Sequence, residues 1–420
     1  MRLLILNIFL FLSVLGFGQV DKMEWFDDAK LGIFIHYGVY SVNGIDESWS
    51  FFNNYISHED YMDQLKKFNG EKYDATQWAS LIKKSGAQYA VLTSKHHDGV
   101  ALWDSEVGSL KTNKDYVAPF VSAIRNEGLK VGIYYSILDW SHPDYDVYKR
   151  NKKRYNIKED PARWENFTTF NHGQIKELSD RFNPDLWWFD GDWEHSAAEW
   201  KAPEIKSLIQ SKNPNAIINS RLTNQGDYDT PEQGVPLTSP ENNHWELCLT
   251  SNDSWGYQPN DKNYKTTNQV IRILVDCIQM GGNLLLDIGP KPDGTIPEEQ
   301  VEILEGVGRW MNKHKGDVYD MQKGIPPGYY YGATALSRDS TILYLFLDYN
   351  PNEEIVIKGL ENEVNRVWVV GNGTKLRHRV MSRPYWSNKP GLLYIDVPDD
   401  VLDKDVTVLA LLLDGKIKLE

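Results

Sequence analysis

An apolar segment that ends in a carboxylate is the first feature of the chain that could carry chemistry. Residues 185–193 run Asp-Leu-Trp-Trp-Phe-Asp-Gly-Asp-Trp, so the apolar stretch stops at Asp190. If this stretch is a strand of a β/α barrel, Asp190 lies at its carboxyl end, where such barrels hold their active sites. Trp188 then shares a face with Asp190, because strand side chains alternate. Asp-Gly is equally typical of a plain turn, so this segment alone leaves a structural role open.

Three other strand-like segments end in polar or aromatic side chains. They finish at His36, at the run from Lys95 through His96 and His97 to Asp98, and at Tyr134-Tyr135-Ser136. A metal site is one interpretation of the histidines. Neighbouring residues of an extended strand point to opposite faces, however, and the chain has neither an H-x-H pair nor an H-E-x-x-H helix. We therefore expect no metal and no other cofactor, and we expect these side chains to bind hydroxyl groups.

Alternating strands and helices between about residues 23 and 315 must position these residues. Repeated βα units predict a parallel sheet, and their number favours a (β/α)₈-like TIM barrel over a doubly wound sheet. Thr295 and Glu298 predict a capping box ahead of the last helix. Strands are expected at residues 31–37, 88–93, 131–137, 185–189, 216–219 and 283–288, and helices at 76–85, 117–127, 173–182, 204–211 and 269–280.

The pattern changes after a proline- and glycine-rich segment at residues 324–328. Beyond it, β segments are expected at residues 341–346, 354–358, 364–370, 392–397 and 406–413. Short strands separated by Gly, Asn, Asp and Pro predict a small antiparallel β-sandwich. The expected domains are a catalytic barrel at residues 19–323 and a sandwich at 328–420.

The N-terminus and the composition limit where the protein works and what it binds. Residues 1–18 have the basic start, apolar middle and small-residue end of a secretory signal peptide, which predicts a secreted or periplasmic protein with no membrane span. A net charge of −14 argues against nucleic-acid binding. Cys248 and Cys277 are the only cysteines, and their pairing cannot be deduced from the sequence, nor can the oligomeric state.

Six motifs, in order along the chain, resemble those of the α-L-fucosidases of glycoside hydrolase family 29. They are WFDDAKLGIFIHYG at 25–38, KHHDG at 95–99 with ALWD at 101–104, YYSILDW at 134–140, WFDG at 188–191, NDSWGY at 252–257 and GNLLLDIGP at 282–290. The resemblance implies a retaining exo-glycosidase that removes terminal α-L-fucose from a fucosylated glycan. It also implies a (β/α)₈-like barrel followed by a β-sandwich.

The same resemblance assigns site residues. The family nucleophile falls on Asp190. Trp49 is expected to contribute to the pocket, but a serine between Glu47 and Trp49 departs from the family pattern and puts Glu47 in doubt. Substrate-contacting residues fall on His36, His96, His97, Tyr135, Trp188 and Arg221.

The general acid/base is harder to locate. A retaining mechanism needs a second carboxyl group about 5 Å from the nucleophile. Glu232, in Thr-Pro-Glu-Gln, resembles the position that many bacterial members use and is preferred. Glu246, in His-Trp-Glu-Leu, is the alternative, unless it only supports the floor of the pocket.

Three alternative functions remain. A fucose-binding homologue without activity would have no use for paired acids such as Asp190 and Glu232. A barrel metallohydrolase using His96, His97 and Asp190 would be sensitive to chelators. A hydrolase for a related sugar, such as an α-L-galactoside, is the hardest to separate, because one methyl group in a pocket discriminates by only about 1–3 kcal/mol.

Overall fold

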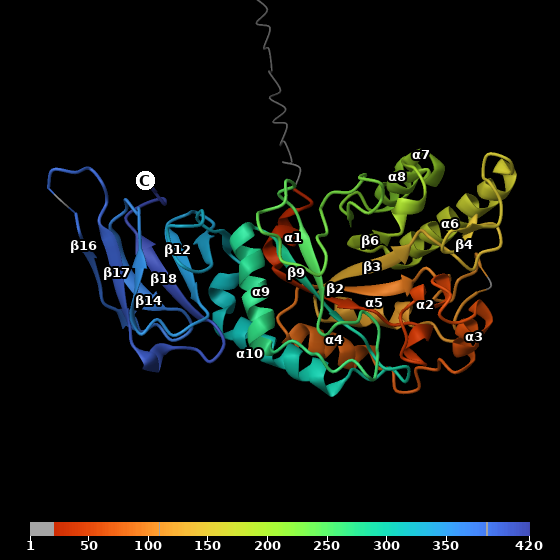
Figure 1. The fold of residues 1–420 in the computed structure, drawn as a ribbon, viewed down its shortest axis with the longest axis horizontal. Coiled ribbons are helices and arrows are strands. Elements are labelled where there is room, and N and C mark those ends of the chain that lie inside the picture. The colour runs from red at the N-terminus through yellow and green to blue at the C-terminus, as the bar shows by residue number, and fades with distance from the viewer. Residues whose placement is uncertain (1–20, 109, 384) are drawn as a thin grey trace, which may run out of the picture.

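The protein is described by a computed structural model that covers residues 21–108, 110–383 and 385–420, so the predicted signal peptide lies outside the described residues. Its barrel part, which ends with the helix at Glu298–Val318, is built on a seven-stranded sheet in which every neighbouring pair is parallel (Figure 1). In spatial order the strands are β7 (Ile217–Ile218), β6 (Leu186–Asp190), β3 (Lys130–Ser136), β2 (Tyr89–Lys95), β1 (Leu31–Ile35), β9 (Asn283–Ile288) and β8 (Glu246–Thr250).

An irregular segment fills the gap between β7 and β8. Tyr228 bridges to Asn219 just after β7, Asp229 bridges to Trp245, and Glu232 bridges to Cys248 on β8. The segment therefore occupies an eighth position of the wall and closes the sheet into a barrel. This position has no helix before it, and it carries Glu232.

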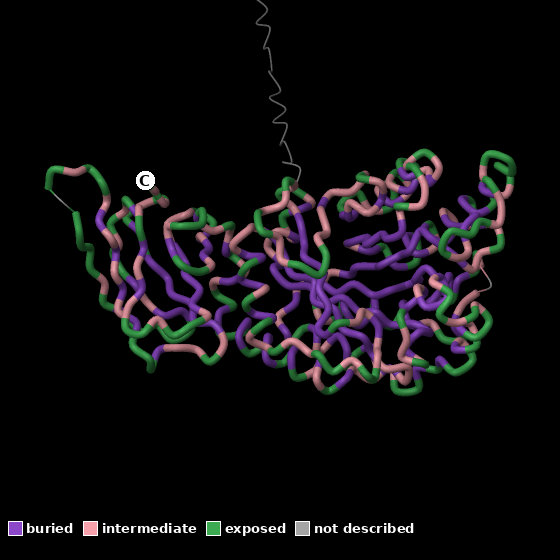
Figure 2. Tube along the Cα trace, viewed as in Figure 1, coloured by how far each residue is buried: buried purple, intermediate pink, exposed green. Residues whose placement is uncertain are grey.

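Helices cover the outside of the barrel. The strands β1, β2, β6, β8 and β9 are buried along their whole length, as expected for a parallel sheet with a packed interior and a helical coat (Figure 2). The predicted (β/α)₈-like barrel is thus confirmed. The main helices are α4 (Ala75–Lys84), α5 (Val117–Asn126), α6 (Pro161–Phe182), α8 (Ala202–Lys212), α9 (Thr267–Met280) and α10 (Glu298–Val318), and shorter ones are α1 (Glu24–Ala29), α2 (Trp49–Phe52), α3 (His58–Met62) and α7 (Ala197–Trp200).

Two helix starts differ from the predictions. Helix α6 begins a full twelve residues before residue 173, because Asp160 accepts a hydrogen bond from the Arg163 amide and Pro161 occupies the first turn. The capping box predicted around α10 is wrong. Pro297 is the N-cap there, and the Thr295 hydroxyl donates to Asp293 instead.

From Met321 onward the chain forms two antiparallel sheets, which confirms the predicted sandwich. The larger sheet begins at β10, within the range 19–323 expected for the barrel. Its order is β10 (Met321–Lys323), β11 (Thr334–Ser337), β12 (Ile342–Leu347), β18 (Thr407–Leu413), β14 (Val364–Val369) and β15 (Lys375–Leu376). The smaller sheet has the order β13 (Glu353–Ile357), β17 (Leu392–Val397) and β16 (His378–Met381).

One apolar cluster is continuous from the barrel into the larger sheet of the sandwich. It contains Val307 and Trp310 of α10 together with Val408 and Ala410 of β18. The Trp310 indole also donates to the Val406 carbonyl at 2.8 Å. In the described ranges, no helix has the length and apolar character needed to cross a bilayer.

We predict that Trp310 joins the two parts energetically. Trp310→Ala should lower the free energy of unfolding by about 3–5 kcal/mol, because it leaves a cavity in a shared core. Its neighbour Arg309 pairs with Asp405 at the surface, and Arg309→Ala should cost less than about 1 kcal/mol. Urea unfolding of both variants, followed by tryptophan fluorescence and circular dichroism, measures the difference. Equal losses would show that the shared core contributes little.

Candidate active site

A cavity of about 160 Å³ opens at the carboxyl ends of the barrel strands. Its lining combines carboxylates, imidazoles, one guanidinium and aromatic rings. Of the residues indicated by the sequence, it contains His36, Trp49, His96, His97, Trp188, Asp190, Arg221 and Glu232; it also contains Phe34, Glu47, Tyr134, Trp193 and Trp255. The fold thus brings residues from 34 to 255 together.

Asp190 is the last residue of β6, and hydrogen-bond donors hold its carboxylate. The Tyr134 hydroxyl donates to Oδ2 at 3.0 Å, and Nη1 of Arg221 lies 3.3 Å from Oδ1. The chain turns sharply at Gly191, which has a φ of +91°, and a Cβ atom there would lie 2.4 Å from Leu138. Glycine is needed at this turn, and the turn ends the strand with Asp190 at the cavity.

Arg221 connects the two carboxylates of the cavity. Its Nη1 contacts Asp190, while its Nη2 donates to Oε2 of Glu232 at 2.7 Å. Burial alone would lower the pKa of Arg221, but the two carboxylates raise it, so the guanidinium stays charged. The cation also lies over the Trp188 ring, 4.6 Å from its centre. This arrangement fixes Arg221, Asp190 and Glu232 relative to one aromatic wall.

Each of the three histidines is held through Nδ1. Asp287 contacts Nδ1 of His36 at 2.7 Å, Ser48 contacts that of His96 at 2.6 Å, and Ser136 contacts that of His97 at 2.6 Å. With Nδ1 occupied, Nε2 of His36 and of His96 is left for a ligand in the cavity, whereas Nε2 of His97 lies 3.6 Å from Oδ2 of Asp190.

The histidines are neutral near pH 7. Burial lowers the pKa of His36 and His96 well below the usual value, and burial and the Lys95 ammonium lower that of His97 to about 3. The Ser136 hydroxyl donates to the Leu138 carbonyl, so it accepts from Nδ1–H of His97. Nε2 of His97 is then an acceptor, suited to a donating hydroxyl group.

The two candidate acids lie in different surroundings. Glu232 is exposed at the edge of the cavity. Glu246, on β8, is fully buried and does not line the cavity. It accepts hydrogen bonds from Tyr89 at 2.5 Å and from the Trp188 indole at 2.9 Å. Burial raises the pKa of Glu246 to about 7. Glu246 therefore orients the Trp188 ring from outside the cavity, through the indole nitrogen.

The placement of Tyr135 in the pocket is corrected by the structure. Its side chain lies on the outer face of β3, where its hydroxyl donates to Gln174 of helix α6 and accepts from Lys95. Tyr134, one residue earlier, points into the barrel and lines the cavity. A motif with two consecutive tyrosines at a strand end does not show which of them points into the barrel. The alternation of side chains along β3 places Tyr134 inside and Tyr135 outside.

Several cavity residues were missed or left in doubt by sequence reasoning. Glu47 lines the cavity despite the inserted serine, and its carboxylate accepts a hydrogen bond from the Gly256 amide at 2.5 Å. Burial raises the pKa of Glu47 to about 7. Trp255 belongs to a quoted motif but was given no role, and Trp193 follows Asp190 so closely that its position could have suggested one.

The cysteines and possible metal ligands can also be placed. Cys248 and Cys277 are both buried and free, so they do not form a disulfide. Across the described ranges, no group of three or more His, Cys, Asp or Glu side chains is arranged to hold a metal ion.

A carboxylate pair at the carboxyl end of a parallel barrel, in a cavity lined by imidazoles and indoles, is the arrangement of a glycoside hydrolase. The sequence profile of the family described as "Alpha-L-fucosidase" matches residues 17–316. The α-L-fucosidase of Dictyostelium discoideum is 32% identical over 333 residues, which are 70% of this chain and 71% of that protein.

Solved structures agree. Alpha-L-fucosidase isoenzyme 1 from Paenibacillus thiaminolyticus has a TM-score of 0.85 and 31% identity, covering 94% of this chain and 99% of that one. A family 29 α-L-fucosidase from Bacteroides thetaiotaomicron, trapped as a covalent intermediate, has a TM-score of 0.83 and 26% identity, with coverage of 95% and 97%. The chain belongs to the α-L-fucosidase family, glycoside hydrolase family 29, which confirms the resemblance of its motifs.

The buried Glu246 predicts a specific pH dependence of stability. Its folded pKa, about 7, lies above its ordinary value of 4.5, so its contribution to stability is complete below pH 4.5 and is lost as the pH rises through 7. Glu246→Gln cannot titrate and keeps an oxygen for Tyr89 and Trp188. Between pH 5 and 8 the variant should gain up to about 3 kcal/mol relative to wild type. Urea unfolding at several pH values measures this, and parallel pH profiles would contradict it.

Proposed function

We propose that the protein hydrolyses terminal α-L-fucosides with retention of configuration, with Asp190 as nucleophile and Glu232 as general acid/base. The observation that carries this proposal is the position of Asp190 and Glu232 on two nitrogens of one guanidinium, at the wall of one cavity. Membership of the family supports it, as does the covalent intermediate formed by the Bacteroides relative with 2-fluoro-fucosyl fluoride.

In the first step, Asp190 attacks the anomeric carbon of the sugar. The bond from that carbon to the leaving-group oxygen breaks, a bond to the Asp190 carboxylate forms, and Glu232 gives its proton to the departing oxygen. Tyr134 and Arg221 hold the Asp190 carboxylate in place for attack. Glu232 lies at the exposed edge of the cavity, on the side open to the rest of the glycan.

In the second step, Glu232 removes a proton from water while the water oxygen attacks the anomeric carbon. The bond to Asp190 breaks, and fucose leaves with the configuration of the substrate. Glu246 takes no part in either transfer in this scheme. Its role is to position Trp188, which it reaches through the indole nitrogen.

The cavity suits a sugar with polar and apolar faces. Nε2 of His36 and of His96 is left to bind hydroxyl groups, and Nε2 of His97 can bind one beside Asp190. Phe34, Trp188 and Trp255 offer apolar surface to C–H groups and a methyl group. An α-L-galactoside, which carries a hydroxyl group in place of that methyl, is the second candidate substrate. Comparing kcat/KM on nitrophenyl α-L-fucoside and α-L-galactoside decides between them.

We also propose that the protein is exported and cleaved after Gly18. The basic, apolar and small-residue pattern of residues 1–18 supports this. Expression of the full chain should yield a mature protein that begins at Gln19 outside the cytoplasm. Intact mass and N-terminal sequencing of each cell fraction measure this, and a retained Met1 in the exported protein would contradict cleavage.

The roles of the two acids predict products of opposite configuration. Asp190→Gly should lose nearly all activity, because no covalent intermediate forms, and added azide should then give β-fucosyl azide. Glu232→Ala should still react with a dinitrophenyl fucoside, whose leaving group needs no proton, and azide should attack the intermediate to give α-fucosyl azide. Nuclear magnetic resonance of the azide products identifies the anomers.

The leaving group provides the matched control for this experiment. Loss of acid catalysis typically costs about 10²–10⁴-fold, so the defect of Glu232→Ala should grow with the basicity of the leaving group. Glu246→Ala should lower activity on all leaving groups alike, since it only disturbs Trp188. If Glu246→Ala shows the dependence and Glu232→Ala does not, the acid/base is Glu246.

A further inference from the structure

A strongly basic hairpin lies on the barrel of this acidic protein. The chain has a net charge of −14, yet six cations occur between residues 149 and 158: Lys149, Arg150, Lys152, Lys153, Arg154 and Lys158. The hairpin consists of β4 (Val147–Lys149) and β5 (Lys152–Lys153), with a turn at Asn151, whose φ is +60°. It follows β3, so it belongs to the face of the barrel that holds the cavity.

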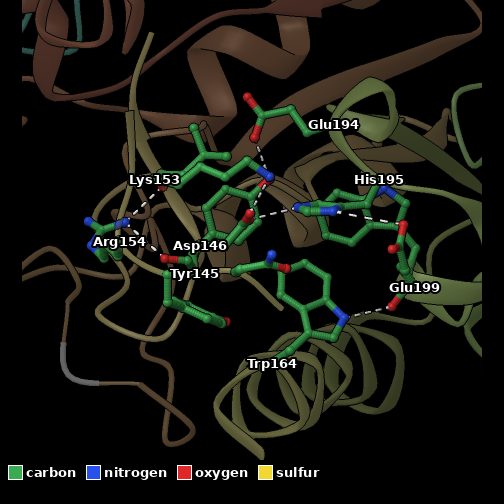
Figure 3. A network of polar contacts seen from close by, with 12 residues as sticks. Tyr145, Asp146, Lys153, Arg154, Trp164, Glu194, His195 and Glu199 are labelled. Atoms are coloured by element: carbon green, nitrogen blue, oxygen red, sulfur yellow. Dashed lines mark hydrogen bonds and ion pairs between the residues drawn. The ribbon is translucent and has the colours of Figure 1, made fainter. Parts of the chain in front are cut away.

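The base of the hairpin uses two of these cations internally, as Figure 3 shows. The buried Asp146 carboxylate contacts His195 and Lys153, each at 2.8 Å. Arg154 donates to the carbonyls of Tyr145 at 3.0 Å and Val147 at 2.7 Å. These contacts fasten the hairpin to the loop after β6 and hold it in one position.

The other cations at the tip have no acidic partner. Lys149 Nζ donates to Asn54 at 2.9 Å, and Arg150 Nε donates to Asn53 at 2.7 Å, both neutral side chains. Lys152 is exposed at the turn. Among the described residues, no carboxylate lies within ion-pair distance of these three cations, which we call the tip cations.

The tip lies beside the mouth of the cavity. The Arg150 amide donates to the Phe52 carbonyl at 3.0 Å, and Phe52 ends the same short helix, α2, that Trp49 begins. Trp49 lines the cavity and stacks on Trp193, whose side chain is 52% exposed. In Figure 1, β4 and α2 lie together at the end of the molecule opposite the sandwich. The tip is therefore bonded to the helix that carries one wall of the cavity, and its cations lie next to that wall on the outside.

We propose that the tip cations bind an anionic group, a sulfate ester or a uronate carboxylate, on the sugar next to the terminal fucose. The proposal rests on the function proposed above and names its substrate class: fucosylated anionic polysaccharide. An arginine fork and lysine ammonium groups match the oxygens of both anions. The net negative charge of the protein repels an anionic polysaccharide. Unpaired cations grouped near the cavity attract such a polysaccharide and offset this repulsion locally.

The test compares matched substrates and matched variants. The substrates are fucosyl-galactose with and without a 6-sulfate, and fucosyl-glucuronate beside fucosyl-glucose. The hairpin variant is Lys149→Gln/Arg150→Gln/Lys152→Gln, in which glutamine keeps a donor for Asn53 and Asn54. The control, Lys375→Gln/Arg377→Gln/Arg383→Gln, removes three exposed cations from the distant sandwich.

The readout is the ratio of kcat/KM for each anionic substrate over its neutral partner. Wild type should prefer at least one anion, and the preference should shrink as salt rises. The hairpin variant should lower that ratio by roughly 3- to 100-fold, since an exposed ion pair contributes about 1.4- to 5-fold. The control should keep it. The anion with the larger loss identifies the group bound.

Three results would overturn the proposal: no anionic preference in wild type, an unchanged ratio in the hairpin variant, or an equal fall in the control. Damage to the fold would lower kcat/KM for the anionic and the neutral substrate alike and would leave their ratio unchanged. If wild type hydrolyses no fucoside at all, the proposed function fails separately. Electrophoresis through gels with dextran sulfate or neutral dextran then tests the hairpin alone, and equal retardation of wild type and hairpin variant by dextran sulfate would refute it.

Discussion

The contact of one guanidinium, that of Arg221, with two carboxylates organises the barrel part of this protein. The Arg221 side chain is 21% exposed, and the carboxylates of both Asp190 and Glu232 lie within ion-pair distance of it. Because each carboxylate contacts a different nitrogen of the same group, Arg221 keeps the two acids at one cavity. Because Trp188 covers the guanidinium, the same contact also places the aromatic wall. The positions of both acids and of Trp188 in the cavity thus depend on this one side chain.

A second layer of contacts holds the residues around Arg221. Each cavity histidine is fixed by a partner on its Nδ1, and Trp188 is fixed by Glu246, so the groups that face the sugar do not have to find their orientation when it binds. Such preorganisation reduces the ordering cost of binding. The free energy of folding is reduced instead, because the fold keeps acids such as Glu246 buried, where their pKa is raised.

Sequence patterns predicted the parts of this structure that follow from local chemistry. Strand ends that carry His36, His96 and Asp190 were recognisable because apolar runs stop at polar residues, and these three do meet in one cavity. Tyr135 was assigned to the pocket in place of Tyr134, because the motif does not show which residues of the strand face the inside of the barrel. Glu47 was left in doubt because a serine separates it from Trp49, and the hydrogen bond that its carboxylate accepts in the cavity comes from Gly256, 209 residues away.

The two carboxylates that contact Arg221 lie on differently paired parts of the barrel wall. Asp190 ends a strand that is paired on both sides, whereas Glu232 lies on a segment held by isolated bridges to Asn219, Trp245 and Cys248. Segments with few bonds open at much lower free energy than the core of a sheet. We therefore expect the segment that carries Glu232 to open at a lower denaturant concentration than β6. The two carboxylates would then lose their shared contact with Arg221 while the sheet is still folded.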